Sequence, residues 1–340
     1  MDQNELCLVA DIGGTYARFA IYDATGSEQR FHLTLAVSRY STIDLAIAEL
    51  LQQFQMSAAV DGGAIGVVVL AVAGPIVGDS VQLTNSTWSF SRHRLQQAFG
   101  WRALWVLNDF AAIAYSLGHL GDNHLRTIGP ELLADSQQTR AVLGPGTGLG
   151  VAALVHDVYG MAVLAGEGGH VHFAPVSALE QALLAYLARE HATVQREDLL
   201  SGRGLCRLYQ AVAAVCGEAV PVLDDPAIIT ERAVQQPEAF CARVLNVFCG
   251  ILGSVAADVA LEMGATGGVY IGGGIVPRVG DFFAASPFRQ RFEAHSSFAG
   301  YLQNIPTFLL SSNDTGLLGA LVFLQKMLQK HGGNTRHSQR

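Results

Sequence analysis

The sequence predicts an α/β fold made of two lobes, and three observations support this prediction. At 340 residues the chain is longer than one hydrophobic core usually supports, so two domains are expected. Segments rich in Val, Ile and Leu alternate with segments of helical periodicity, which is typical of a sheet covered on both faces. The strand, glycine turn and strand predicted at 6–23 recur in the same layout at 141–157. This repetition predicts a duplicated lobe.

The first half of the chain alternates between strands and helices. After the first hairpin, Ser41 or Thr42 can cap a helix, because the apolar residues that follow keep helical spacing: Ile43, Ile47, Leu50, Leu51 and Phe54. Apolar runs at 64–74 and 103–108 predict two further strands. The second of these runs directly into a helical pattern at 109–118.

The second half is more helical. Ser177 and Glu180 have the spacing of a capping box and predict the start of a helix. A long helix is predicted from Pro237 to Met263, because proline favours the first turn of a helix and Gly264 follows the last periodic residue.

The C-terminal region begins with a predicted strand at 267–277. A final helix is expected from about Asp314 to Gln329. The last ten residues, "HGGNTRHSQR", predict a loose tail.

Composition and charge exclude several classes of protein. Half of the residues are hydrophobic and only 15% are charged, which permits a large core and excludes an intrinsically disordered chain. The formal net charge is -8, and the Lys and Arg residues are scattered along the sequence. Nucleic acids and anionic membranes are therefore not expected as partners, and any anionic ligand must be held locally.

Cysteine usage and hydropathy point to a soluble cytoplasmic protein. The five cysteines are an odd number without CxxC spacing, which argues against a disulfide framework or a structural zinc site. No cationic leader with an apolar core precedes the first strand. The apolar run at 64–76 is short and is interrupted by Gly-Pro.

The stretch "ADIGGTYAR" at 10–18 forms a glycine turn in which backbone N–H groups can approach an anion. A P-loop is excluded because no lysine follows the glycines here or in "GPGTGLGVA". A dinucleotide-binding turn is excluded because a returning strand, rather than a helix, follows each turn. One such turn alone is also explained as a tight hairpin. Two related turns and a third glycine cluster at 272–274 favour a polyphosphate site.

Four motifs in fixed order carry a resemblance to a known superfamily. "VADIGGTYARFAIYD", "GPGTGLGVA", "GGVYIGGGIVPR" and "NDTGLLGA" resemble the phosphate-1, phosphate-2, adenosine and C-terminal connecting motifs of the sugar kinase, actin and Hsp70 superfamily. Their spacing covers residues 6 to 329. Within this superfamily, "TNSTW", "NDF", "GEGGHVHFAP" and "LLSGRGL" resemble the bacterial ATP-dependent glucokinase family.

The resemblance implies a ribonuclease H-like duplicated fold with a ligand cleft between the two lobes. It implies a small α/β domain of residues 1–119 and 313–330 and a large α/β domain of residues 120–312. The flexible tail is then 331–340. It also implies a homodimer, ATP as the phosphoryl donor and Mg²⁺ as the metal, although composition does not distinguish ATP from polyphosphate or ADP.

The nucleotide site follows from the same resemblance. Asp11 would hold Mg²⁺ through water, because a metal that bridges phosphate oxygens makes a nearby carboxylate useful. The residues implied to contact the nucleotide are Ala10, Asp11, Ile12, Gly13, Gly14, Thr15, Thr147, Gly148, Gly273 and Gly274. The turn departs from the family at Tyr16, where glucokinases usually have Asn. This departure concerns the geometry of the turn and the affinity for nucleotide.

The resemblance also implies the sugar site. Asn108 and Asp109 would bind sugar hydroxyls, and Asp109 would accept the proton of the 6-hydroxyl. Taken alone, Asp109 is better explained as a helix N-cap, and the resemblance reverses this preference. The other implied sugar ligands are Glu167, His170 and Glu197.

Each of these has a simpler explanation. His170 and His172 resemble a metal pair but lack further ligands, and a histidine between glycines also fits a structural turn. A lone glutamate such as Glu197 is usually a surface residue. Trp88 fits core packing at least as well as stacking on a sugar.

The predicted function is the ATP-dependent phosphorylation of D-glucose at its 6-hydroxyl, the entry step of glycolysis. Three alternatives stay open from the sequence. The protein could phosphorylate another hexose, it could sense a sugar without catalysis, or it could be an ATPase related to actin or Hsp70. Asp109 and the acceptor-rich set of sugar ligands favour the first prediction.

Overall fold

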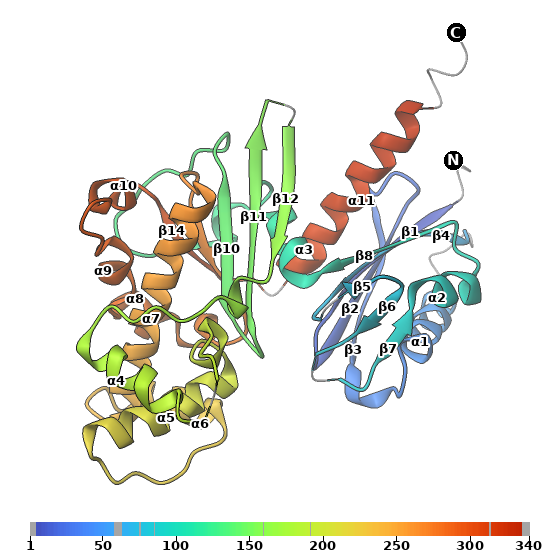
Figure 1. The fold of residues 1–340 in the computed structure, drawn as a ribbon. Helices are drawn as coiled ribbons and strands as arrows, with labels where there is room; N and C mark the ends of the chain where they lie inside the picture. The colour runs from blue at the N-terminus through green and yellow to red at the C-terminus, as the bar shows by residue number, and fades with distance from the viewer. Residues whose placement is uncertain are drawn as a thin grey trace. The chain divides into compact units, whose positions relative to one another are not determined.

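The computed structural model describes residues 5–57, 63–74, 76–84, 86–158, 160–190, 192–312 and 314–334. The chain divides into two compact units (Figure 1). The first unit is Met1–His119 with Asn313–Arg340, and the second is Leu120–Ser312. Asn85 and Asn313, which belong to two of the sequence motifs, and residues 335–340 of the predicted tail lie outside the described residues.

The first unit is built on a five-stranded sheet of order β3-β2-β1-β4-β8. Its strands are β1 (Leu6–Ile12), β2 (Tyr16–Tyr22), β3 (Gln29–Ala36), β4 (Ile65–Val72) and β8 (Ala103–Asn108). The first three strands form an antiparallel meander, whereas β4 and β8 run parallel to β1. A small sheet of β5 (Ile76–Val77), β6 (Ser80–Gln82) and β7 (Ser89–Ser91) is attached.

Helices cover both faces of this sheet, as the sequence predicts (Figure 1). They are α1 (Ile43–Met56), α2 (Arg92–Phe99), α3 (Asp109–Ser116) and α11 (Thr315–Asn334), with the short 3₁₀ turn η1 (Val37–Arg39). Side chains of β1 alternate between two cores: Leu8 packs in the cluster that includes α1, and Val9 in the cluster that includes α11. Trp88 is a core residue whose indole N–H donates to the Tyr40 carbonyl at 2.8 Å.

The second unit repeats this topology. Its six-stranded sheet has the order β12-β11-β10-β13-β14-β9, again with three antiparallel strands followed by two parallel ones. The strands are β9 (Leu125–Thr127), β10 (Arg140–Pro145), β11 (Leu149–Asp157), β12 (Gly160–Gly166), β13 (Val269–Ile271) and β14 (Thr307–Leu310). Strand β9 extends the sheet by pairing antiparallel with β14. The duplication predicted from the glycine hairpins is thus a repeated sheet.

The helices of the second unit surround a long central helix. They are α4 (Ala178–Leu187), α5 (Gly202–Cys216), α6 (Pro226–Gln235), α7 (Phe240–Met263), α8 (Gly280–Ala285), α9 (Phe288–Glu293) and α10 (Ala299–Gln303). Four 3₁₀ turns complete the unit: η2 (Asp122–His124), η3 (Gly168–His170), η4 (Arg196–Asp198) and η5 (Val276–Val279). Helix α7 is long and apolar enough to cross a membrane, yet 72% of its most apolar window is buried within the protein. It is a core helix.

Several predicted boundaries differ from the structure. Helix α7 begins at Phe240, because Pro237 lies in a turn instead of the first helical turn. Strand β13 is much shorter than 267–277, because Gly268 and Gly273 adopt positive φ angles of 126° and 83° on either side of it.

Two further differences concern helix ends. Helix α11 continues to Asn334 instead of ending at Gln329, so residues 331–334 are helical and do not belong to a loose tail. Each added residue extends an existing helix by one hydrogen bond, which offsets the low helix propensity of its glycines. At the start of α4, Ser177 caps as predicted, but the Glu180 carboxylate accepts from the Val176 N–H instead of completing a capping box.

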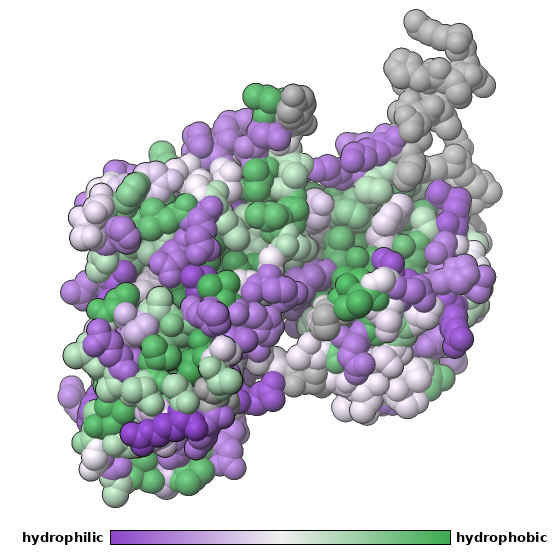
Figure 2. Space-filling view, in the orientation of Figure 1, coloured by the Kyte–Doolittle hydropathy of each residue, from purple (hydrophilic) through white to green (hydrophobic). Residues whose placement is uncertain are grey.

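The surface is mixed in character. On the face shown in Figure 2, hydrophilic and hydrophobic residues are interspersed. Large apolar side chains such as Leu133, Val158 and Val77 are exposed. Single exposed apolar residues of this kind are normal on a protein surface.

Candidate active site

The register of the first sheet places the predicted residues of the first unit at one edge. In the parallel strands, Ile12 of β1 is level with Val72 of β4, and Val72 is level with Asn108 of β8. Asp11 and Asn108 therefore lie at the carboxyl ends of strands that are two positions apart, roughly 10 Å in the hydrogen-bonding direction. Ligands of α/β proteins usually bind at this edge.

Asn108 and Asp109 join β8 to α3. The Asn108 side-chain carbonyl accepts from the N–H groups of Phe110 at 2.9 Å and Ala111 at 3.3 Å, so Asn108 is the N-cap of α3. Asp109 is the first helical residue, and its carboxylate also accepts from the Phe110 N–H at 2.9 Å. The cap role considered for Asp109 thus belongs to its neighbour.

Helix α11 supports this edge of the sheet. Gly319 packs directly against the Ala112 carbonyl of α3, where any side chain would collide. At the start of the same helix, Gly316 lies so close to Asp11 that an added Cβ would be 2.8 Å from the carboxyl carbon. Two glycines of one helix therefore allow its close approach to α3 and to Asp11.

Asp11 lies in a charged cluster. Its carboxylate is 3.5 Å from the Arg18 guanidinium, and Arg18 is also 3.9 Å from the Asp314 carboxylate. The Asp11 side chain is only 16% exposed. Burial raises its pKa to about 6; Arg18 acts in the opposite direction and Asp314 adds to the rise.

The first glycine turn is closed by its own backbone. The Gly13 N–H donates to the Tyr16 carbonyl at 3.0 Å, and the Thr15 carbonyl accepts from the Val37 N–H at 2.9 Å. Among the described residues, a Cβ on Gly13 would meet only the Tyr16 carbonyl, at an ordinary 3.6 Å, and the φ of Gly13 is not positive. Nothing in the part of the chain that the structure describes requires glycine at this position, so the turn leaves room for a ligand to approach closely.

The second glycine turn is held by neighbouring elements. The Gly146 carbonyl accepts from the Gly202 N–H of α5 at 2.8 Å, and the Pro145 carbonyl accepts from the Ile275 N–H at 3.2 Å. A Cβ on Gly144 would collide with the backbone of Gly272. The predicted phosphate-2 and adenosine motifs, including Gly273 and Gly274, are therefore in direct contact within the second unit, with Thr147 exposed.

The segment after β12 carries Glu167 and His170. Gly166 pairs with Val151, so Glu167 lies at the same sheet edge as the second turn. Gly168 and Gly169 allow η3 to pack on β11, because side chains there would collide with Val151 and with the Leu149 backbone. Both Glu167 and His170 are exposed.

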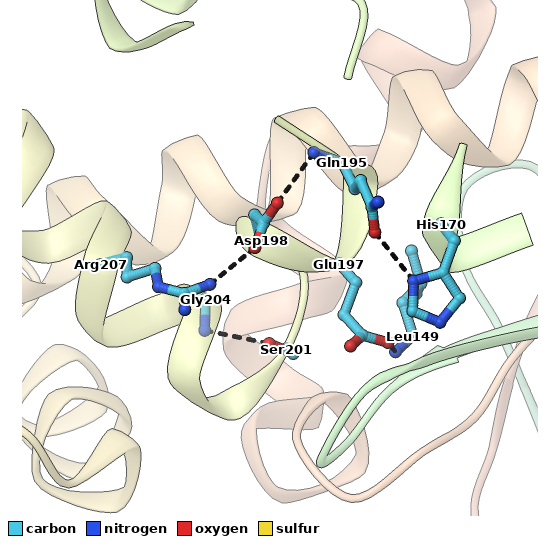
Figure 3. Close-up of polar contacts among 8 residues, drawn as sticks. All are labelled: Leu149, His170, Gln195, Glu197, Asp198, Ser201, Gly204 and Arg207. Atoms are coloured by element: carbon cyan, nitrogen blue, oxygen red, sulfur yellow. Dashed lines mark hydrogen bonds and ion pairs between the residues drawn. The ribbon is translucent and has the colours of Figure 1, made fainter. Parts of the chain in front are cut away.

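Figure 3 shows how η4 supports this segment. The Glu197 carboxylate accepts from the Leu149 N–H at 2.8 Å, directly after the second turn. His170 Nδ1 is 2.8 Å from the Gln195 side-chain oxygen. This bond, with the negative charges of Glu197, Glu167 and Asp198, raises the pKa of His170.

Comparison with known proteins assigns the chain to a family. The family model described as Glucokinase matches residues 8–327. A glucokinase of Nitrobacter hamburgensis is 43% identical over 314 residues, which are 92% of this chain and 95% of that protein. The chain belongs to the glucokinase family.

Solved structures agree with this assignment. The crystal structure of a glucokinase from an Antarctic psychrotroph is 38% identical, with a TM-score of 0.82, and the match covers 95% of this chain and 99% of that one. A glucokinase of the ROK family from Streptomyces griseus, solved with glucose and AMPPNP, is 19% identical with a TM-score of 0.57 over 93% of this chain and 98% of its own. The second match shows a common fold. The predicted sugar kinase, actin and Hsp70 type of fold is confirmed.

The residues predicted for a glucokinase site gather at one sheet edge in each unit. In the first unit, Asp11, Gly13, Asn108 and Asp109 lie at one sheet edge, with Ala10, Ile12, Gly14 and Thr15 in or beside the first turn. In the second unit, the second turn and the glycines after β13 lie at the carboxyl edge of the sheet. Glu167, His170 and Glu197 lie at the same edge. Among the described residues, no cluster of three or more His, Cys, Asp and Glu side chains is grouped for a metal ion.

Two residues of the candidate site were not predicted, Gln195 and Asp314, and neither was the ion pair that Arg18 forms with Asp11. Arg18 belongs to the quoted first turn, and its pairing with Asp11 in the β1–β2 hairpin register, Asp11 opposite Arg18, could have been found from the hairpin alone. Asp314 and Gln195 are far in sequence from their partners, so no local pattern indicates them.

Proposed function

We propose that the protein transfers the γ-phosphoryl group of ATP to the 6-hydroxyl of D-glucose. The observation that carries this proposal is the place of Asp109, at the start of α3 and the carboxyl end of β8, in a chain of the glucokinase family. The relatives named glucokinase cover almost the whole chain, which supports the same activity.

Asp109 is proposed as the general base. Phosphoryl transfer needs mostly positioning and charge stabilisation, and a carboxylate suits the task of orienting and deprotonating the attacking hydroxyl. A bond forms between the sugar O6 and the γ-phosphorus while the bond from that phosphorus to the β,γ-bridging oxygen breaks. The hydroxyl proton passes to Asp109, and ADP leaves.

Asn108 and three residues of the second unit are proposed to bind the sugar. The capping bonds of Asn108 use its side-chain carbonyl, so its amide N–H₂ is the group that suits a sugar oxygen. Glu167, His170 and Glu197 offer acceptors for O–H donors of a polyhydroxyl ligand. Such a set rejects a sugar that lacks one hydroxyl, because its partner would be left unpaired.

The glycine turns and Asp11 are proposed to hold the nucleotide and its metal. Gly13 has room for a close approach, and Thr147 is exposed on the second turn. Asp11 fits Mg²⁺ because its carboxylate is ionised at neutral pH, with a pKa of about 6, and has Asp314 nearby as a second acidic group. A single carboxylate suits a Mg²⁺ ion that keeps most of its water. When bound, the metal would offset the charge of the phosphate oxygens.

The cellular setting is proposed from the family. We expect a cytoplasmic enzyme at the entry to glycolysis that works as a homodimer. No nucleic-acid or membrane partner is proposed, since the basic residues are scattered.

A coupled phosphorylation assay tests the proposal. The protein is supplied with ATP and Mg²⁺ and with glucose, mannose, fructose or N-acetylglucosamine in turn, with and without EDTA. Turnover that is strongest on glucose and is abolished by EDTA is expected. Preference for another hexose would identify a different sugar kinase. Glucose binding without turnover on any sugar would favour a sensor.

A further inference from the structure

We propose that Gln195 is a positioning residue that holds the His170 ring in a single tautomer, with its Nε2 presented as a hydrogen-bond acceptor to the sugar. The proposal rests on the proposed function for the identity of the ligand. It extends that function to a residue that makes no contact with the reacting atoms.

The first step of the argument is the hydrogen bond itself. His170 Nδ1 is 2.8 Å from Gln195 Oε1 (Figure 3). A side-chain amide oxygen can only accept, so the hydrogen of this bond belongs to Nδ1. Above the raised pKa of His170 the imidazole is neutral, so only one ring nitrogen carries a hydrogen and Nε2 is left with a lone pair.

The second step is that the two backbones are locked together. The Phe173 N–H donates to the Val194 carbonyl, and the Arg196 N–H donates to the Val171 carbonyl, each at 2.9 Å. These bonds form an isolated antiparallel bridge that pairs His172 with Gln195. Gln195 therefore keeps its place relative to the segment that carries His170.

The third step is that η4, which follows Gln195 directly, is anchored to two helices of the second unit, α5 and α7. The Arg196 guanidinium, 5% exposed, lies 3.2 Å from Asp258 and 3.5 Å from Glu262 on α7. The Asp198 carboxylate accepts from the Gln195 N–H at 2.9 Å and pairs with Arg207 of α5 at 2.7 Å. The backbone of Gln195 is thus held in place by two helices of the core, so its side-chain oxygen is presented to the His170 ring from a fixed position.

The chemical consequence concerns the sugar. A hydroxyl donates readily to an imidazole lone pair, so a fixed Nε2 acceptor complements a ligand rich in O–H groups. His170 is exposed, and without Gln195 its ring would exchange tautomers and rotamers before binding. Holding the ring in advance removes this cost from sugar binding.

The experiment combines ring spectroscopy with kinetics on the full-length protein. Histidine is labelled with ¹⁵N, and His170→Gln identifies the signals of this ring among the 11 histidines. At alkaline pH, we expect pyrrole-type Nδ1 and pyridine-type Nε2 in the unsubstituted protein. Gln195→Leu should give a mixture of tautomers, whereas Gln195→Glu keeps an acceptor and should retain Nδ1–H.

Kinetics then separate positioning from general damage. In Gln195→Leu the KM for glucose should rise about three- to tenfold, the equivalent of one ordinary hydrogen bond, while kcat stays within about twofold. Gln181→Leu, at an exposed site on α4 of the same unit, is the matched control and should change neither value.

Three outcomes would overturn the proposal. They are an Nε2–H tautomer in the unsubstituted protein, an unchanged ring spectrum in Gln195→Leu, or a changed spectrum with an unchanged KM for glucose. Failure of the proposed function would differ, since the unsubstituted protein would then bind glucose without turnover. In that case the glucose Kd of Gln195→Leu decides in place of KM, with the same rise expected.

Discussion

The two glycine turns have the same layout in the sequence but owe their glycines to different causes. In the first turn, residues 12–16, the backbone closes on itself, and among the described residues a Cβ on Gly13 would meet nothing closer than 3.6 Å. In the second turn and the end of β10 that leads into it, residues 144–149, the chain is bonded to α5, to the segment after β13 and to Glu197. A side chain on Gly144 or Gly148 would collide with Gly272 or with the Glu197 carboxylate.

This difference separates glycines that the fold needs from glycines that a ligand needs. The second turn requires glycine for packing, so we expect a substitution there to lower the free energy of unfolding. The first turn tolerates a Cβ among the described residues. We therefore expect a substitution there to lower kcat/KM for ATP and to leave stability nearly unchanged. The same sequence motif therefore predicts two different kinds of mutant.

Among the variants at or beside the two turns, Asp11→Asn should give the largest effect, and it acts next to the first turn. Without the carboxylate proposed to hold Mg²⁺, kcat/KM for ATP should fall by about three orders of magnitude, on the scale of a lost electrostatic contact to a reacting phosphate. Coupled assays over a range of Mg²⁺ concentrations measure this loss. A fall of less than tenfold would remove Asp11 from the metal site.

The same variant should be more stable than the parent in the absence of ligands. The folded-state pKa of Asp11 is raised from 3.8 to about 6, so the folded protein binds this proton more tightly than the unfolded chain does. The resulting stability is fully present below about pH 4 and is lost as the pH rises through 6. At pH 8, Asp11→Asn should therefore exceed the parent by on the order of 1–3 kcal/mol.

Urea unfolding at pH 4 and pH 8 without metal checks this prediction. The advantage of Asp11→Asn should be absent at pH 4 and present at pH 8. A difference that does not vary with pH would mean that the burial of Asp11 carries no cost.

Gly144→Ala should give the next largest effect, as a loss of stability. The added Cβ collides with backbone, which cannot move aside like a flexible side chain. We expect a destabilisation of about 3 kcal/mol, at the upper end for overpacking. The control is Gly300→Ala in α10, where a Cβ meets nothing within 4 Å. Equal unfolding midpoints for the two variants would contradict the packing role.

Gly13→Ala tests the first turn, where we expect a loss of activity without a loss of stability. Its unfolding free energy should stay within about 1 kcal/mol of the parent, because the backbone conformation suits alanine and no contact is too close. The methyl group should block a phosphate, so kcat/KM for ATP should fall about 10- to 100-fold. Full activity together with full stability would show that no ligand approaches this turn.

Tyr16→Asn should have the smallest effect. The Tyr16 side chain is exposed, and the turn is closed by its backbone carbonyl instead of its ring. Stability should change by less than about 0.5 kcal/mol, as for most surface substitutions, and the KM for ATP by less than about threefold. A tenfold gain in ATP affinity would instead identify Tyr16 as an obstacle in the nucleotide site.

Much of the architecture could be predicted because it depends on local patterns. Both hairpins follow from alternating strands around glycine, and α3 follows from the polar residues Asn108 and Asp109 after an apolar strand. Boundaries were less accurate where local patterns conflicted. The apolar residues after β13 predict a longer strand, but the glycines on either side of it end the strand early. Pro237 fits a turn as well as a helix start.

The supporting residues of the site could not be predicted from the sequence. Gln195 touches His170 only because a β bridge joins their segments, and Asp314 reaches Arg18 only because α11 returns to the first sheet. Such contacts depend on tertiary structure. The choice between Asn108 and Asp109 as the helix cap likewise required the side-chain geometry.

The most direct test of the proposed function is Asp109→Asn, measured by single-turnover phosphorylation of glucose together with calorimetric glucose binding. The amide keeps the shape of the side chain and removes its basicity. We predict that phosphoryl transfer slows by about 10²- to 10⁴-fold, the usual contribution of a general base, while the Kd for glucose changes by less than about threefold. A near-normal rate of transfer would contradict the account, because Asp109 could not then be the group that accepts the proton of the 6-hydroxyl.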